Sequence, residues 1–308
     1  MGLRLNGKVQ QSHRMVVFVV IFILMTLLFL YGSNNSSSEA YIPIHVAVNR
    51  FLINTDLKKW AGKEGYMPLH RNKSMKLHCH KCALVTSSSH VLGSGAGEEI
   101  DHTECVIRMN DAPTSGYEVD VGTRTTLRVV AHSSVFRVVR RPSDFLNSTD
   151  KNSVMIFWGP PNKIGKEAKG PLYRLIQRVS ATYSNMSFYT INQTKMHRFD
   201  TLFHRETGRD RQKSHSWLST GWFTMVIAIE TCDSIKVYGM VPPSHCGKKH
   251  VSKKMPYHYY KPRGPDECLT YLQSESGRRG NYHRFITEKQ VFGRWAKLYN
   301  ITFTHPSW

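Results

Sequence analysis

Residues 218–240 read Leu-Ser-Thr-Gly-Trp-Phe-Thr-Met-Val-Ile-Ala-Ile-Glu-Thr-Cys-Asp-Ser-Ile-Lys-Val-Tyr-Gly-Met, and the fold prediction starts from them. The apolar run 222–232 predicts a buried helix, and residues 235–240 predict a strand soon after it. The Ser-Thr-Gly before the run is an ordinary N-cap sequence for such a helix. A helix followed closely by a strand is typical of α/β domains.

Further elements are expected on both sides of this stretch. Short apolar runs predict strands at residues 82–85, 106–109, 126–130, 154–158, 187–191 and 301–303. Helices are expected from Pro171 and around residues 291–298. This alternation predicts a single α/β domain with a mostly parallel sheet, in which ligands bind outside the carboxyl ends of the strands. The glycine-rich residues 93–97 match a dinucleotide loop poorly, and we expect a flexible loop there with no helix after it.

Composition excludes several classes of protein. The 308 residues are 40% hydrophobic, with 42 Lys and Arg against 22 Asp and Glu, which gives a formal net charge of +20. A chain this apolar is neither wholly disordered nor collagen-like. The single concentrated apolar run and the mean hydropathy of −0.39 exclude a protein with many membrane spans. The positive charge indicates either acidic ligands or a solvated basic surface.

The apolar run near the start predicts a membrane anchor. Residues 15–31 are almost wholly apolar and follow Arg4, Lys8 and Arg14, so the positive-inside rule places residues 1–14 in the cytosol. We expect a signal anchor at 15–31, a stem at 32–76 and a luminal domain at 77–308. The run is shorter than the roughly 20 residues of a typical span, and a signal peptide cleaved near Gly32 or Ser33 is the alternative.

Glycosylation sequons and cysteines agree with a luminal location. Sequons start at Asn34, Asn35, Asn72, Asn147, Asn185, Asn192 and Asn300. The chain has six cysteines, namely Cys79, Cys82, Cys105, Cys232, Cys246 and Cys268. In an oxidising compartment they predict three disulfides, for which 15 connectivities exist. A zinc site is the alternative for the Cys-x2-Cys pair at positions 79 and 82.

Four blocks, in this order, resemble the motifs of the animal sialyltransferase family. Cys82-Ala-Leu-Val85 with residues 98–101, 106–114 and 120–126 resembles the large sialyl motif. Residues 218–232 with 237–240 resemble the small motif, and residues 258–260 the third. His283 and Glu288 have the spacing of the very small motif. The sequence between the blocks is most similar to the α-N-acetylgalactosaminide α-2,6-sialyltransferase branch.

The resemblance implies a Rossmann-like domain, a GT-A-like variant, that transfers sialic acid from CMP-sialic acid. The acceptor would be GalNAc in sialyl-α-2,3-galactosyl-β-1,3-GalNAc, on a glycolipid such as a ganglioside or on a glycoprotein. The protein would be a single-pass type II protein of the Golgi membrane, with no nucleic-acid partner. CMP is a monophosphate, so no metal is expected, and the chain contains no Asp-x-Asp pair.

The family also assigns the donor-binding residues. Asn110 matches the asparagine that holds the nucleotide, although its spacing alone favours a turn ahead of Pro113. Ser87 stands where many members have Asn. The residues that match the small-motif turn against the donor are Ser219, Thr220 and Gly221.

Two histidines would perform the chemistry. His283 matches the proposed general base that takes the proton of the acceptor hydroxyl. His258 would stabilise the departing phosphate, either as a cation or as a hydrogen-bond donor. Glu288 is expected to support the fold around His283, or to be solvated at the start of a helix. Lys261 departs from the family pattern and is expected to affect the pKa of His258 or the acceptor preference.

Tyrosines and disulfides complete these expectations. Tyr257, Tyr259 and Tyr260 would wall the acceptor site or pack in the core. The resemblance pairs Cys82 with Cys232 and Cys246 with Cys268, which leaves Cys79 with Cys105.

Three other functions remain as alternatives. The first is a catalytically silent luminal glycan-binding protein of the same fold. The second is a secreted hydrolase with a Ser-His pair, against which the missing G-x-S-x-G motif argues. The third is a basic nucleic-acid binder, which a luminal location disfavours. Oligomeric state is not predicted.

Overall fold

The computed structural model describes residues 20–27, 64–70, 73–146, 153–165, 170–247, 254–277 and 282–308. The chain divides into two units, Met1–Ile53 and Asn54–Trp308. In the first unit, residues 20–27 form an exposed helix inside the predicted anchor, and the rest of that unit, including the predicted tail 1–14, lies outside the described residues. No helix in the described residues is both long and apolar enough to cross a membrane.

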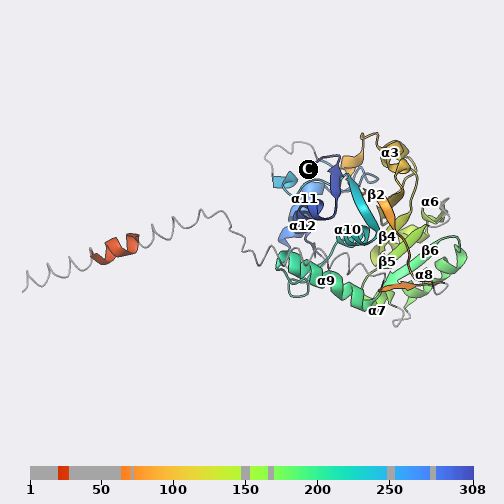
Figure 1. Cartoon of the computed structure of the whole chain (residues 1–308), viewed down its shortest axis with the longest axis horizontal. Helices are drawn as coiled ribbons and strands as arrows, with labels where there is room; N and C mark the ends of the chain where they lie inside the picture. The colour runs from red at the N-terminus through yellow and green to blue at the C-terminus, as the bar shows by residue number, and fades with distance from the viewer. Residues whose placement is uncertain are drawn as a thin grey trace, which may run out of the picture. The chain divides into compact units, whose positions relative to one another are not determined.

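A sheet of eight strands, counted over the described residues, forms the centre of the second unit (Figure 1). Its order is β1-β6-β5-β4-β3-β2-β8-β10, and all neighbours are parallel except β1 and β6. The strands are β1 Tyr66–Pro68, β2 Cys79–Val85, β3 Cys105–Met109, β4 Leu127–Ala131, β5 Val154–Trp158, β6 Ser187–Ile191, β8 Cys232–Tyr238 and β10 Ile301–Thr304. The predicted α/β fold with a mostly parallel sheet is confirmed.

The folded domain begins earlier than predicted. Strand β1 lies in the segment assigned to the stem, and Tyr66 pairs with Ile191 of β6. Met75, also in that segment, is buried. A strand of three residues at the edge of the sheet is too short to show a hydrophobic period. The start of the folded domain before residue 77 could therefore not be predicted from the sequence pattern.

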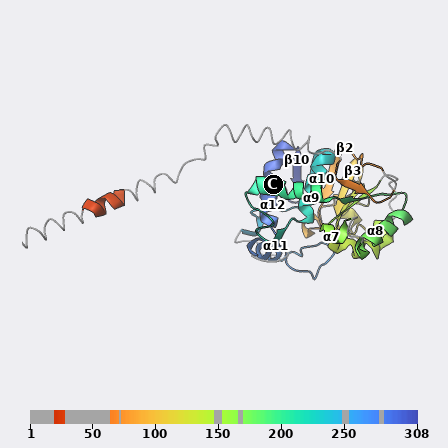
Figure 2. The same cartoon turned by 90° about the horizontal axis from the view of Figure 1, so that it is seen from below.

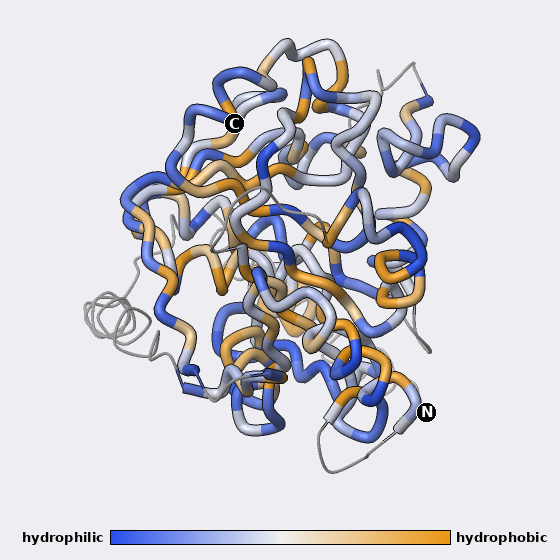
Figure 3. Tube along the Cα trace, turned by 90° about the vertical axis from the view of Figure 1, so that its right-hand side faces the viewer, coloured by the Kyte–Doolittle hydropathy of each residue, from blue (hydrophilic) through white to orange (hydrophobic). Residues whose placement is uncertain are grey.

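Helices cover both faces of the sheet (Figures 1 and 2). One face packs against α9 (Gln193–Thr207), α10 (Thr220–Thr231) and α12 (Phe285–Leu298), where Trp222 lies against Trp295. The other face packs against α5 (Val135–Val139), α6 (Pro142–Phe145), α7 (Pro161–Ile164) and α8 (Pro171–Thr182). Figure 3 shows hydrophobic and hydrophilic residues alternating along much of the trace, as expected for helices that bury one side. Helix α10 differs, because every residue from Trp222 to Ile229 is buried.

The expectation for residues 93–97 is wrong in one respect. A short helix, α3 (Gly97–His102), follows directly, and it packs against α4 (Glu118–Val121). A Cβ atom on Gly97 would lie 1.9 Å from the carbonyl oxygen of Glu118, so only glycine permits this close approach. A helix of six residues is too short for a hydrophobic period to reveal it.

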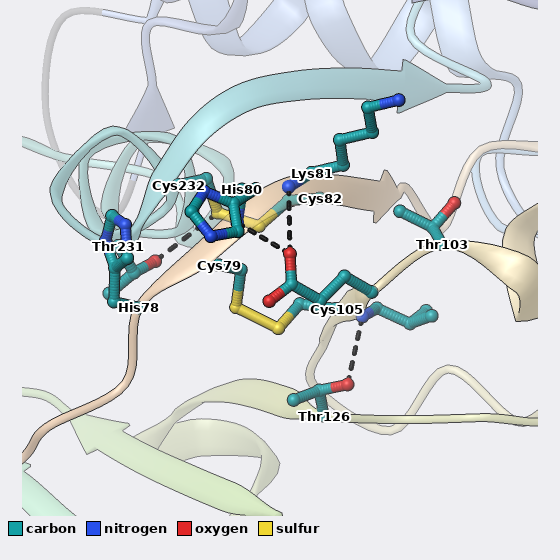
Figure 4. Close-up of a disulfide and its surroundings, with 12 residues drawn as sticks. His78, Cys79, His80, Lys81, Cys82, Thr103, Cys105, Thr126, Thr231 and Cys232 are labelled. Atoms are coloured by element: carbon teal, nitrogen blue, oxygen red, sulfur yellow. Dashed lines mark hydrogen bonds between the residues drawn. A yellow bond between two sulfur atoms is a disulfide. The ribbon is translucent and has the colours of Figure 1, made fainter.

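The three predicted disulfides are confirmed. Cys82 is bonded to Cys232, and Cys79 to Cys105, which ties β2 to both of its neighbours (Figure 4). The remaining disulfide joins Cys246 to Cys268 at the start of α11 (Glu267–Ser276). The zinc alternative for positions 79 and 82 is therefore wrong, because both sulfur atoms are bonded to other cysteines.

Candidate active site

A cavity of about 470 Å³ lies at the carboxyl ends of β5, β4, β3, β2 and β8. Five adjacent strands place its two ends about 19 Å apart. The amino end of α10 and parts of α11 and α12 form the rest of its wall. This is the position at which parallel α/β sheets bind ligands.

Most of the predicted site residues meet in this cavity, although they are distant in the sequence. Those that line it are Ser87, Asn110, Ser219, Thr220, Gly221, His258, His283 and Glu288. Tyr259 and Tyr260 are not among the lining residues, whereas Tyr257 is.

Asn110 is both a turn residue and a cavity residue. It follows β3 with φ of 47°, a left-handed conformation that asparagine tolerates better than most residues. Its Oδ1 accepts a hydrogen bond from the Ala131 amide at 2.9 Å, and its Nδ2 donates to Thr220 Oγ1 at 3.3 Å. The side-chain amide therefore joins the end of β4 to the first turn of α10.

Ser219 and Glu288 form a buried network at the amino end of α10. Ser219 Oγ accepts a hydrogen bond from the Trp222 amide at 3.1 Å, which is the N-cap predicted from the sequence. The Ser219 amide donates to Glu288 Oε1 at 2.9 Å, and the Ser219 hydroxyl donates to Glu288 Oε2. Burial raises the pKa of Glu288 to about 8. Glu288 is therefore not a solvated helix residue, and its contacts orient the small-motif turn.

This buried carboxyl predicts a pH-dependent stability. Between about pH 4.5 and pH 8, the folded protein keeps a proton on Glu288 that the unfolded chain has lost. Stability falls as pH rises wherever the folded state binds more protons, here with a limiting slope of about 1.4 kcal/mol per pH unit. We expect the unfolding free energy of Glu288→Gln, measured by urea titration, to decrease less over this range than that of the wild type.

The exposed Glu98 offers a matched control for this experiment. The Glu98→Gln variant should keep the pH dependence of the wild type. An equal pH dependence in Glu288→Gln and in the wild type would contradict the assignment.

His283 is held in one tautomer. It lies on β9 (Tyr282–His283), which pairs with β7 (Ser216–Trp217). Its Nδ1 lies 2.9 Å from the carbonyl oxygen of Trp217, so Nδ1 carries the hydrogen and Nε2 is left with a lone pair. Burial lowers the pKa of His283, with the Trp217 hydrogen bond opposing the shift, and the neutral form is favoured. A neutral imidazole in a cavity can accept a proton from a bound hydroxyl.

His258 lies between the small-motif turn and His283 in the sequence. Its ring stacks on that of Tyr260, with ring centroids 5.1 Å apart. Burial, followed by the positive charge of Lys261, lowers the pKa of His258 to about 4. The ring is thus neutral near pH 7, which favours the hydrogen-bond donor over the cation. The sequence left the direction of the Lys261 effect open, and in the structure the charge of Lys261 lowers this pKa.

The neighbouring tyrosines have different roles. Tyr259 is in the core, where its hydroxyl donates to the carbonyl oxygen of Pro113 and its ring packs against Tyr117. Tyr257 lines the cavity beside Tyr271. Of the two roles expected for Tyr259, the structure therefore shows packing in the core.

Several residues that line the cavity were not predicted from the sequence. They are His132, Arg137, Lys163, Trp217, Tyr271 and Lys289. His132 directly follows β4, and Lys163 comes shortly after β5, so their position after predicted strands was an available signal. The Lys289 ammonium lies 3.6 Å from the centroid of the Tyr271 ring, and burial lowers its pKa to about 7.

The fold and the cavity together define a class of protein. The basic residues Arg137, Lys163 and Lys289 line the cavity, and Glu288 is the only acidic lining residue in the described part of the chain. The amino end of α10 also favours anions. With a tautomer-fixed histidine in the same cavity, this is the arrangement of an enzyme that binds an anionic donor and transfers a group to a hydroxyl.

Comparison with known proteins gives the family. Residues 53–298 match glycosyltransferase family 29 (sialyltransferase), and the chain belongs to this family. A human relative, alpha-N-acetylgalactosaminide alpha-2,6-sialyltransferase 6, is 55% identical over 97% of this chain and 88% of its own. The bovine protein of the same name is 54% identical over 99% of this chain and 91% of its own.

Two further proteins are more distant. The human alpha-N-acetyl-neuraminyl-2,3-beta-galactosyl-1,3-N-acetyl-galactosaminide alpha-2,6-sialyltransferase is 47% identical over 75% of each chain. A mammalian sialyltransferase solved with Gal-beta-1-3GalNAc-ortho-nitrophenol is 23% identical, with a TM-score of 0.44 over 73% of this chain and 69% of that one. The sequence between the four blocks favours the fifth and sixth members of the α-2,6 branch, the sixth in particular, in agreement with the relatives that carry the number 6.

Proposed function

We propose that this chain transfers sialic acid from CMP-sialic acid to O-6 of GalNAc in sialyl-α-2,3-galactosyl-β-1,3-GalNAc, with gangliosides as the favoured acceptors. The domain is a Rossmann-like, GT-A-like variant. The observation that carries this proposal is the geometry of His283, whose Nδ1 is committed to Trp217 in the same cavity as Asn110 and the α10 turn. The names of the 55% and 47% identical relatives support the linkage and the acceptor.

The chemistry follows from these groups. Nε2 of His283 takes the proton from O-6 as that oxygen attacks C2 of the sialyl donor, and the bond from C2 to the CMP oxygen breaks. Attack from the face opposite CMP inverts the configuration through an oxocarbenium-like transition state. A hydrogen bond from His258 and the amino end of α10 stabilise the charge that develops on the phosphate. No metal ion takes part in this scheme.

The positive end of the cavity supports a sialylated acceptor. Lys163 and Arg137 both line the cavity, and in the chain they follow shortly after β5 and β4. Arg137 is paired with Asp111 at 2.8 Å, whereas Lys163 has no ion pair among the described residues. The Lys163 ammonium is thus available for the carboxylate of the sialic acid already present on the acceptor.

An acceptor panel tests the proposal. We expect the purified protein to release CMP from CMP-sialic acid and to form an α-2,6 linkage, with sialylated glycolipids preferred over sialylated glycoproteins and both over their desialylated forms. Product linkage is read by mass spectrometry after linkage-specific sialidase digestion. Binding of CMP-sialic acid without CMP release would favour the silent glycan-binding protein instead.

Two variants sharpen the panel. Lys163→Met should lower kcat/KM for sialylated acceptors while leaving desialylated acceptors nearly unchanged. Lys297→Met, an exposed lysine outside the cavity lining, serves as the control. An equal loss of kcat/KM for both types of acceptor would contradict the contact between Lys163 and the carboxylate. It would not contradict the proposed transfer reaction.

We also propose that the protein is a single-pass type II protein of the Golgi membrane with its catalytic domain in the lumen. The apolar run 15–31 with basic residues before it, the sequons and the three disulfides support this location. Its partners would be this membrane and a sialylated glycolipid or glycoprotein, with no nucleic acid.

A further inference from the structure

Two histidines and an aspartate gather at the amino end of β2, where the proposed transfer reaction does not use them. His80 Nδ1 lies 3.0 Å from Asp233 Oδ2, and His78 Nε2 lies 3.4 Å from the same oxygen. All three side chains are about half exposed or more. We propose that His78, His80 and Asp233 bind a divalent transition-metal ion of the zinc type.

The backbone brings the three residues to one place. His78 and His80 are two positions apart, so they point to the same side of an extended chain. The registers Cys79↔Cys232 and Lys81↔Ser234 place Asp233 opposite His80 on the neighbouring strand β8. One potential ligand atom from each residue lies within 4.8 Å of the other two.

The distances suit a tetrahedral metal site. Zinc binds imidazole nitrogen and carboxylate oxygen at about 2.0–2.2 Å, which puts neighbouring ligand atoms about 3.3 Å apart. The distances from Asp233 Oδ2 to the two histidine nitrogens, 3.0 and 3.4 Å, are close to this value. Three protein ligands leave a fourth position for water.

Disulfides hold the ligand positions in place. Cys79 lies between the two histidines and is bonded to Cys105, and Cys232 directly precedes Asp233 and is bonded to Cys82. Figure 4 shows both imidazoles beside these disulfides. Because the backbone is already cross-linked at these positions, little conformational entropy is lost when a metal binds. The cysteine sulfur atoms are themselves unavailable as ligands.

The metal would act on stability and not on transfer. His80 lies at the start of β2, and the cavity begins after its end, at Thr86. The strand has seven residues, so the two sites are about 20 Å apart. A metal bound only by the folded protein would strengthen the pairing of β2 with β8 and raise the unfolding temperature.

Zinc titration of the intact, disulfide-bonded protein tests this inference. After removal of metals with a chelator, we expect calorimetry to show one zinc site that His80→Ala and Asp233→Asn each weaken by about tenfold or more. Zinc should also raise the unfolding temperature of the wild type more than that of these variants. His102→Ala, which changes an exposed histidine outside the cluster, should match the wild type in both measurements.

Cobalt(II) gives an independent readout, because four-coordinate cobalt shows intense visible absorption that the two variants should lose. His80→Gln, which keeps the size of the side chain, checks that the loss is one of ligation. Sialyl transfer should be equal in the presence of chelator and of zinc, so the result does not depend on the proposed function. Zinc affinity that is absent in the wild type, or unchanged in Asp233→Asn, would overturn the inference.

Discussion

His283→Ala is expected to lower kcat for sialyl transfer by about 10²–10⁴-fold, the usual contribution of a positioned general base. Nδ1 of this histidine is fixed by the Trp217 carbonyl oxygen at 2.9 Å, so only Nε2 can take the proton of the acceptor hydroxyl. Alanine removes the imidazole nitrogen that takes the proton, so water must take it instead. CMP release with a sialylated acceptor measures the rate.

The donor contacts come from other elements, so the affinity for CMP should change little in this variant. His197→Ala, on the exposed side of α9, should keep full activity. A His283→Ala protein that transfers sialic acid at the wild-type rate, or that loses CMP binding in proportion to activity, would contradict the assignment of the base.

The pH profile gives the same histidine a second signature. Burial lowers the pKa of His283 below the usual 6.5, so the base remains unprotonated at lower pH than an exposed histidine would. The acid limb of kcat/KM should therefore lie below pH 6.5 in the wild type. The residual activity of His283→Ala should lack this limb.

Replacing Cys82 and Cys232 together with serine is expected to cost about 5 kcal/mol of unfolding free energy in the chain-entropy model. The bond closes a loop of 150 residues and joins two buried positions on adjacent strands. Its loss gives the unfolded chain many more conformations. Urea unfolding at constant pH, followed by circular dichroism, measures the difference.

The Cys246–Cys268 disulfide is the matched control. It closes a loop of only 22 residues, so its replacement should cost about 3 kcal/mol. A smaller loss for the Cys82 and Cys232 pair than for this pair would contradict the entropic argument.

Local patterns predicted the interior strands well and the peripheral elements poorly. Strand β5 was predicted with its observed bounds because all five of its residues are apolar and buried. Helix α9 was missed, since its fifteen residues are mostly polar and its buried set includes Lys195, which is paired with Glu230 at 2.9 Å. An ion pair between elements 35 residues apart compensates the charge, and no local pattern shows it.

The candidate site shows the same division. Resemblance to the family motifs identified Asn110, Ser219, His258 and His283 as candidate site residues, because chemistry of this kind requires particular residue types at particular positions. The sequence did not decide whether Glu288 supports the fold around His283 or is solvated at the start of a helix. Only the contact with Ser219, 69 residues away, decides that point.

The order of residues was enough to establish an α/β sialyltransferase domain, its cysteine pairing by resemblance, and the residue types of its chemistry. Folding alone decided which tyrosine faces the cavity, which nitrogen of His283 is available, and which carboxyl holds a proton at neutral pH. The physical reason is that burial and hydrogen bonding depend on distances between residues remote in the chain, and these distances exist only once the sheet and its helices have packed.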